Sequence, residues 1–304
     1  MNDFVVAADA VAAARQAGLQ KARLAPGQMV LRGALAGGLL GYATSLVMVM
    51  LAQGAPPVAG ALCFPAGFAI LVLLGLELVT GNFALLPLAY LGTTQRSPGA
   101  HGGPARERRE VQEAEPLINM WRNWICVYAG NLLGGVVYAG LFYLAISGAG
   151  ASTGGAVGDQ LRRAAQAKTL AYAALGAQGW ATAVVKGVLC NWMVTLGAVL
   201  AFSSRSTTGK IAAMWLPIFT FFAHGYEHSV VNMFVIPAGM LLGAPVPPAA
   251  WWVWNQIPVT IGNLAGGVLF TGLALHLAYP PHVAAAASPA REATALHAAP
   301  VDAI

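Results

Sequence analysis

A glutamate and a histidine, Glu227 and His228, stand side by side inside an apolar stretch that covers residues 211–243 and contains no Lys, Arg or Asp. Ionisable groups inside a lipid bilayer cost several kcal/mol unless they are paired or face a cavity. Gly225 and Pro237 flank the pair, and both residue types weaken a helix. A broken helix that carries a carboxylate and an imidazole at membrane depth points to a translocation pathway.

The same segment contains His224, so that His224-x-x-Glu227-His228 matches a pattern found in one class of zinc peptidases. Histidines four residues apart share one face of a helix and could both reach a metal ion. However, Gly225 weakens that helix, and no third ligand stands out because His276 lies near the end of the last apolar stretch. A membrane-embedded metalloenzyme is therefore the alternative; we expect no enzyme, no metal and no cofactor, and a packing role for His224.

His228 itself has three interpretations: a pore residue, a structural histidine bonded to a backbone carbonyl, or a metal ligand. We favour the pore residue, because an ordinary imidazole titrates near pH 6.5 and can change charge under physiological conditions. Glu227 would point about 100° away from His228 on a helix. We expect Glu227 to bond backbone amides or a neighbouring polar side chain.

The composition is that of an integral membrane protein. The chain has 304 residues, of which 58% are hydrophobic and 9% charged, whereas soluble domains carry roughly 25% charged residues. Each apolar stretch reaches the ~20 residues that a helix needs to cross a bilayer. The second and fifth exceed thirty residues, which predicts helices interrupted by a loop. The six stretches cover residues 28–51, 60–90, 120–147, 177–203, 211–243 and 250–279.

The positive charges predict the orientation. Lys and Arg concentrate before the first stretch, between the second and third, and between the fourth and fifth, but are absent after the first and fifth. Cytoplasmic loops carry such an excess, so we expect six crossings, both termini in the cytoplasm, and a bacterial inner membrane. Arg162, Arg163 and Lys168 fall on the outer side. The net charge of +5 follows this pattern and does not indicate nucleic-acid binding.

The chain repeats itself. Gly130-Asn-Leu-Leu-Gly-Gly in the third stretch returns 132 residues later as Gly262-Asn-Leu-Ala-Gly-Gly in the sixth. Glu77, Asn82 and Pro87 have the same spacings as Glu227, Asn232 and Pro237. Two halves with three crossings each must run in opposite directions, and inverted repeats place their site near the midplane where discontinuous helices meet. We therefore predict an all-α, polytopic 3+3 inverted repeat with broken second and fifth helices.

The segment Gly225-Tyr-Glu-His-Ser-Val-Val-Asn-Met-Phe resembles the signature of the formate/nitrite transporter family. The resemblance extends over residues 28–280, through the segments 64–68, 77–82, 123–124, 130–131, 187–192 and 257–267. It implies an aquaporin-like protomer in a homopentamer, each protomer with a pore for small monovalent anions. The chain would then consist of a cytoplasmic amphipathic segment (1–27), the channel domain (28–280, with a cytoplasmic insert at 93–115) and a disordered cytoplasmic tail (281–304).

By position, the resemblance implies a role for each pathway residue. His228 would be the central pore histidine and Thr80 its hydrogen-bonding partner. Asn191 and Glu227 would form a polar network behind the histidine, and Lys168 would stand in the outer vestibule, with Lys186 as its rival. The apolar constrictions would consist of Phe64, Phe68 and Phe221 on the periplasmic side and of Leu78 and Val194 on the cytoplasmic side, although Phe68 is bulkier than the aliphatic residue expected there.

The anion that passes is left open by these residues. Formate, nitrite, hydrosulfide, acetate and lactate all fit aromatic constrictions around a histidine, which could lend a proton so that a weak acid crosses in neutral form. Passive and proton-coupled transport, and the direction of flux, also stay open. A water or glycerol channel would need two Asn-Pro-Ala turns, and no Asn here precedes Pro. An ammonium carrier would need more crossings and an intramembrane histidine pair.

Overall fold

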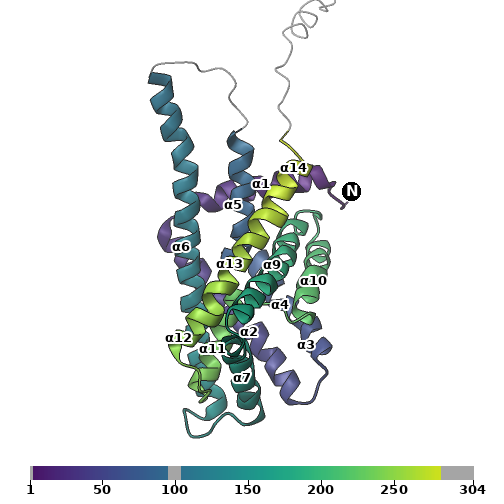
Figure 1. The fold of residues 1–304 in the computed structure, drawn as a ribbon. Helices are drawn as coiled ribbons and strands as arrows, with labels where there is room; N and C mark the ends of the chain where they lie inside the picture. The colour runs from purple at the N-terminus through teal and green to yellow at the C-terminus, as the bar shows by residue number, and fades with distance from the viewer. Residues whose placement is uncertain (1–2, 95–103, 282–304) are drawn as a thin grey trace, which may run out of the picture.

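A computed structural model describes the backbone of residues 3–94 and 104–281 and the side chains of residues 3–92 and 117–281. Within these ranges the chain is helical and contains no β-strand; a single antiparallel bridge joins Phe4 to Ser204. Helix α1 (Ala7–Ala22) lies across the upright bundle near one of its ends (Figure 1). The predicted N-terminal, channel and tail segments stay predictions, and residues 95–103 of the insert and 282–304 of the tail lie outside the described residues.

Four of the predicted stretches form long apolar helices. Within the described residues, the segments long and apolar enough to cross a membrane are Pro26–Ala52, Leu117–Ser147, Ala177–Leu200 and Pro248–Ala278. The first is α2, the second belongs to α6 (Pro104–Ser147) and the third is α9 (Ala177–Leu200). The fourth contains two π-helical turns and is divided into α12 (Pro248–Trp251), η1 (Trp252–Gln256), α13 (Ile257–Gly267), η2 (Val268–Leu273) and α14 (Ala274–Ala278).

The second and fifth stretches are broken, as predicted. The second consists of α3 (Pro57–Cys63), α4 (Pro65–Leu73) and α5 (Val79–Thr94). The fifth consists of α10 (Thr207–Ala223) and α11 (Ser229–Leu241). Helices α7 (Gly155–Lys168) and α8 (Leu170–Ala174) connect the two halves. The number of membrane crossings and the opposite direction of the halves stay predictions.

The two breaks have the same backbone. Each begins with a glycine in the left-handed region, Gly75 with φ of 63° and Gly225 with φ of 66°. Three non-helical residues follow in each case before the next helix starts. Side chains other than glycine are strained at such a φ, so the glycines explain why the helices stop there. Positions 76–78 and 226–228 are thus equivalent.

Two helix pairs pack with their backbones in contact. Helix α2 runs along α6, and α9 runs along α13. A Cβ added at Gly37 would overlap the carbonyl oxygen of Asn131, and one added at Gly134 that of Ala34. Gly262 is similarly close to the carbonyl of Val184. Small residues at four-residue spacing allow this close approach.

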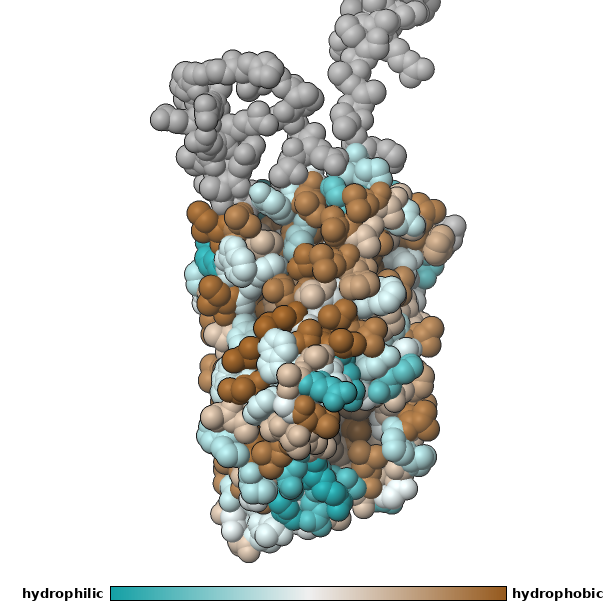
Figure 2. Space-filling view, in the orientation of Figure 1, coloured by the Kyte–Doolittle hydropathy of each residue, from teal (hydrophilic) through white to brown (hydrophobic). Residues whose placement is uncertain are grey.

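The surface of the bundle is largely apolar. Figure 2 shows brown residues over most of its body, between the grey segments at one end and a teal cluster at the other. Exposed apolar patches of this extent mark a surface that another medium covers. For helices of this length that medium is lipid. Among the exposed apolar side chains are Leu31, Leu35, Tyr42, Ile125, Leu133 and Leu277.

Candidate functional site

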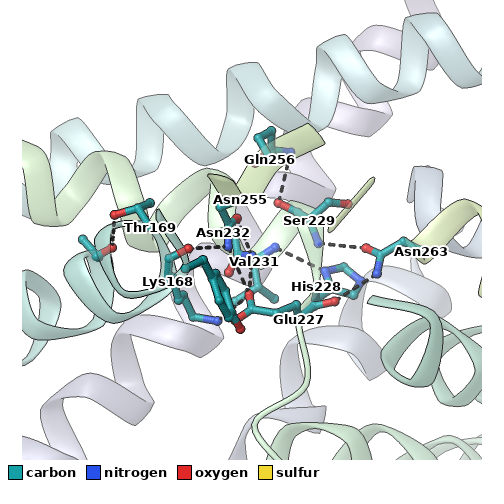
Figure 3. Close-up of polar contacts among 12 residues, drawn as sticks. Lys168, Thr169, Glu227, His228, Ser229, Val231, Asn232, Asn255, Gln256 and Asn263 are labelled. Atoms are coloured by element: carbon teal, nitrogen blue, oxygen red, sulfur yellow. Dashed lines mark hydrogen bonds and ion pairs between the residues drawn. The ribbon is translucent and has the colours of Figure 1, made fainter. Parts of the chain in front are cut away.

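His228 lies at the second break, where it begins α11. Its side chain is almost fully buried, and its Nδ1 accepts a hydrogen bond from the Val231 N–H at 3.2 Å (Figure 3). Its Nε2 lies 3.0 Å from Oγ1 of Thr80, on the helix that follows the first break. Because Nδ1 is an acceptor, the proton of a neutral His228 lies on Nε2 and is donated to the Thr80 hydroxyl. The structure thus brings together the two residues that the sequence paired.

The buried carboxylate of Glu227 accepts hydrogen bonds from several side chains. Its Oε2 accepts from Lys168 Nζ at 2.9 Å and from Asn232 Nδ2 at 2.8 Å, with Asn255 Nδ2 at 3.4 Å. Its Oε1 accepts from the Tyr172 hydroxyl at 3.0 Å. The partners are therefore side chains, one of the two alternatives expected from the sequence. A buried carboxylate surrounded by donors and one cation is held ionised and in place.

Asn263 fixes the loop that carries the pair. Its Oδ1 accepts from the Ser229 N–H at 2.8 Å, and its Nδ2 donates to the Glu227 carbonyl at 2.9 Å (Figure 3). The same Nδ2 donates to the Gly187 carbonyl on α9, also at 2.9 Å. One fully buried amide therefore satisfies both sides of the break and ties it to the neighbouring helix. Asn255 adds a second tie by donating to the Lys168 carbonyl.

The first break is held by an equivalent set. Asn131 accepts from the Val79 N–H at 3.0 Å and donates to the carbonyls of Glu77 at 2.9 Å and Gly33 at 2.8 Å. Glu77 accepts from Lys21 Nζ and from Asn82 Nδ2, at 2.7 and 2.8 Å. The repeat seen in the sequence is therefore a repeat of hydrogen bonds.

A further asparagine in each half completes the correspondence. Asn82 donates to Asn123 and Asn232 donates to Asn255, both at 2.8 Å. Asn123 then donates to the Lys21 carbonyl, as Asn255 does to that of Lys168. Asn123 and Asn255 are separated by 132 residues, the offset of the glycine motif, so the sequence carried a signal for their equivalence. Of these two asparagines, only Asn123 lies in a segment that carries the family resemblance.

Two cavities lie on opposite sides of this region. The small cavity, about 170 Å³, is lined by His228, Lys168, Phe221, Phe222 and Val231, among others. The large cavity, about 480 Å³, is lined by helix α1 and the first break; its lining includes Phe68, Leu78, Lys21, Arg32, Glu77 and Lys210.

The apolar side chains differ in part from the expected constrictions. Phe64 and Phe221 meet edge to face with ring centres 5.8 Å apart. Phe222, which the sequence did not single out, stacks on Phe64 at 4.0 Å. Phe68, expected beside Phe64 and Phe221, lines the large cavity together with Leu78.

The expected cytoplasmic constriction and the network behind the histidine are also located. Val194, on α9, is fully buried. Ala198, one turn later on the same helix, lines the large cavity. Asn191 Nδ2 donates to the carbonyls of Thr80 and Asn263, at 3.0 and 2.6 Å. It therefore links the start of α5, after the first break, to Asn263, which holds the second break, and its Oδ1 has no hydrogen-bond partner among the described residues.

Lys168 rather than Lys186 makes the ion pair with Glu227. Lys186 Nζ lies 5.8 Å from the ring centre of Tyr172, a distance suited to a cation–π contact. Tyr172, on the short helix α8, therefore stands between this lysine and Glu227. The sequence offered no signal for Tyr172, because α8 has only five residues.

His224 does not share a face with His228. Helix α10 ends at Ala223, so the four-residue spacing crosses the break rather than a helical turn. His224 Nδ1 bonds the Thr220 carbonyl, and its ring stacks on Tyr226. No group of three or more His, Cys, Asp or Glu in the described part of the chain could hold a metal ion.

Comparison with known proteins connects this geometry to a family. A family model described as formate/nitrite transporter matches residues 8–99 and 109–277. A probable formate transporter of Methanothermobacter thermautotrophicus is 35% identical over 218 residues, 68% of this chain and 69% of that protein. The formate channel FocA of Haemophilus influenzae is 31% identical over 241 residues, covering 72% of this chain and 73% of its own length.

Solved structures agree in fold. An FNT family ion channel superposes with a TM-score of 0.70 at 26% identity, covering 90% of this chain and 99% of that one. A pentameric formate channel with formate bound gives a TM-score of 0.60 at 26% identity, covering 84% and 97%. The chain therefore belongs to the formate/nitrite transporter family, and it is a multi-pass membrane transport protein and not an enzyme.

Proposed function

We propose that the chain forms a channel for formate and similar small monovalent anions, nitrite among them, in a bacterial cytoplasmic membrane. The observation that carries this proposal is the contact between Thr80 and His228 at the meeting of the two broken helices. The similarity to formate channels and to a pentameric structure supports formate as a substrate and a homopentamer as the assembly. The positive charges favour cytoplasmic termini.

Apolar side chains on both sides of His228 form the barrier. An anion has to leave water to pass Phe64, Phe221 and Phe222, or Phe68 and Leu78 on the other side. An anion therefore needs either hydrogen-bond donors or a proton at this point. His228 Nε2 and the Thr80 hydroxyl are the donors that the geometry offers there.

His228 is the proton donor in the mechanism that we propose. A proton arriving with the anion is taken up on Nδ1, which gives up its hydrogen bond from the Val231 N–H, and the anion beside the charged imidazole supplies the opposite charge. Transfer of that proton from Nε2 to the anion leaves a neutral imidazole and a neutral acid, which crosses the apolar constriction at less cost than the anion. The acid releases its proton in the vestibule beyond, so one proton and one anion move together.

The test is the pH dependence of formate flux in proteoliposomes that carry His228→Asn. We expect wild-type flux to rise as the pH falls, because each anion that crosses takes one proton with it. In the variant, the rise in flux should be no larger than the rise measured in protein-free liposomes. His224→Asn is the matched control, because His224 is exposed and lies outside the contact with Thr80. An unchanged pH dependence in His228→Asn would remove the proton-donor role.

Selectivity is tested separately. Fluxes of formate, nitrite, hydrosulfide, acetate and lactate are compared in wild type and Thr80→Val. Because valine cannot hydrogen-bond, we expect the ratio between these anions to change along with the rate. Native mass spectrometry measures the number of protomers, for which we expect five.

A further inference from the structure

The two cavities differ in charge as well as in size. In the small cavity the cation Lys168 is neutralised by Glu227, 2.9 Å away. In the large cavity Lys21 is neutralised in the same way by Glu77. The large cavity has two more cations, Arg32 and Lys210, and no second carboxylate in its lining.

Arg32 and Lys210 come from different helices, α2 and α10, and both are half-buried. Neither makes an ion pair with a carboxylate in the part of the chain whose side chains are described. The lining therefore carries a formal charge of +2, from three cations and one anion. Two unneutralised cations in a partly enclosed, low-dielectric space create a strong positive potential.

The size of the large cavity exceeds what a single small anion fills. Its volume of about 480 Å³ falls within the roughly 300–1,000 Å³ over which proteins bind whole small molecules. Much of the remaining lining is apolar, with Leu24, Leu71 and Phe202 as examples. Apolar walls and a pair of cations suit an anion that has both a polyvalent group and an apolar or aromatic body.

Such an anion would bind but not pass. The cost of moving an ion out of water grows with the square of its charge, so a dianion meets a barrier at Phe68 and Leu78 several times that of formate. Its body is also too large for a cavity of about 170 Å³ on the other side. Occupation of the large cavity would therefore close the pathway from one side only.

We infer that the large cavity is a binding site for organic phosphates with two or more negative charges, of the nucleoside diphosphate type, and that their binding blocks anion flux. Arg32 and Lys210 hold the phosphates, and the apolar wall receives the body. The inference rests on the proposed channel function for its effect on flux, but not for binding. It makes transport responsive to the phosphate compounds on the side of helix α1.

The experiment measures formate flux across the membrane with ADP added to one side at a time. We expect block from the side of helix α1 and none from the other side. The double variant Arg32→Gln/Lys210→Gln should raise the half-blocking ADP concentration at least ten-fold. The control variant Arg23→Gln/Arg163→Gln removes the same charge from exposed positions outside the cavity lining. ADP should block this variant at the same concentration as wild type. Adenosine, which has the body without the charge, should not block.

The outcomes separate the two proposals. Formate flux that ADP blocks equally from both sides, or equally in the Arg32/Lys210 variant, overturns the phosphate site and leaves the channel intact. Equal block by adenosine also overturns it, because the cations would then play no part. If no formate flux is found, the channel function fails, and calorimetric titration of ADP into the detergent-solubilised protein decides the site: wild type should bind and the double variant should not.

Discussion

The breaks at residues 74–78 and 224–228 share the residues that support their backbone but differ in the side chain that follows the carboxylate. Each has a left-handed glycine, a buried asparagine that bonds both sides of the loop, and a carboxylate paired with a lysine. The positions after the carboxylates differ: Leu78 stands where His228 stands in the other half. Glu227 has Tyr172 as a further donor, and no tyrosine hydroxyl donates to Glu77 among the described residues.

The comparison separates residues that build the pathway from residues that act in it. The shared asparagines Asn131 and Asn263 hold backbone, because their partners are main-chain N–H and C=O groups of the loops and of the neighbouring helices. The unshared histidine reaches across to Thr80 of the other half. The two similar breaks therefore support one unshared histidine, which contacts Thr80 of the other half.

The largest expected effect comes from breaking the shared frame. Asn131→Ala and Asn263→Ala each leave one buried N–H and two buried carbonyls without their partner, at about 1–3 kcal/mol for a buried group. Since hydrogen bonds between membrane helices contribute less on average, we expect each variant to lose about 3–5 kcal/mol, and the two losses to agree within about 1 kcal/mol. Unfolding of the detergent-solubilised protein by SDS measures this, with exposed Gln53→Ala as control. Clearly unequal losses would contradict the equivalence of the halves.

Replacing the two carboxylates should show a difference between the breaks, whereas replacing the two asparagines should show their similarity. Glu77→Gln and Glu227→Gln both remove an ion pair, but the lysines are about a fifth exposed, at 20% and 23%, and can turn toward water. The charged contacts of Glu227 with Tyr172 and Asn255 have no counterpart beside Glu77, so Glu227→Gln should cost about 1–2 kcal/mol more. The same unfolding measurement decides, with the exposed Asp159→Asn as control. The reverse order would show that the additional donors do not stabilise Glu227.

The unequal charge of the two cavities predicts unequal saturation. At zero membrane potential a passive pore must have the same ratio of maximal flux to half-saturating concentration from both sides. A positive cavity concentrates anions, so half-saturation should need several-fold less formate on the side of helix α1, with a correspondingly lower maximal flux. The difference should nearly vanish at about 1 M salt, where the Debye length is about 3 Å, and in Arg32→Gln/Lys210→Gln. Equal half-saturation at low salt would contradict the asymmetry.

The smallest expected effect concerns a contact that joins the N-terminus to the second half. The Asp3 carboxylate accepts from the N–H groups of Arg205 and Ser206 at 2.9 and 2.6 Å and from two serine hydroxyls. The hydrogen bond from Ser204, followed by that from the Ser206 backbone, lowers the pKa of Asp3. A carboxyl whose folded pKa lies below its unfolded value stabilises the fold above the unfolded value, about 3.9, and loses this contribution as the pH falls through the folded pKa.

Hydrogen exchange at the Arg205 and Ser206 amides, corrected for the intrinsic rate, measures this contact. Protection should be constant from about pH 7 to about pH 5 and should decline below about pH 4. In Asp3→Asn it should be low throughout, whereas exposed Asp9→Asn should behave like wild type. Protection in Asp3→Asn that still declined below pH 4 would assign the change to another group.

Much of the fold could be predicted from the chain because its signals are local. The lengths of the apolar stretches predicted the long helices, and the excess length of the second and fifth, with Gly225 in the fifth, predicted both breaks. The spacing of Glu77 to Asn82 and of Glu227 to Asn232 predicted equivalent positions, and the structure shows equivalent contacts.

What could not be predicted depends on contacts between distant segments. The sequence could not distinguish Phe68 from Phe64 as a constriction residue, because the cavity that Phe68 lines also includes α1 and α10. Likewise, Phe222 becomes relevant only through its stacking on Phe64, 158 positions earlier in the chain. The roles of all these residues in transport stay predictions until fluxes are measured.

The backbone contacts at Gly37, Gly134 and Gly262 have a consequence for the speed of transport. If either helix pair slid by one residue, a side chain would replace a glycine against a carbonyl oxygen. Sliding of this kind, which in proteins takes microseconds to milliseconds, is therefore blocked. The motions that remain are rotations of side chains such as Phe221 and the exchange of solvent, which take picoseconds to nanoseconds at exposed sites and longer in a packed interior. The walls therefore act as a fixed frame on these faster timescales, within which side chains and solvent move.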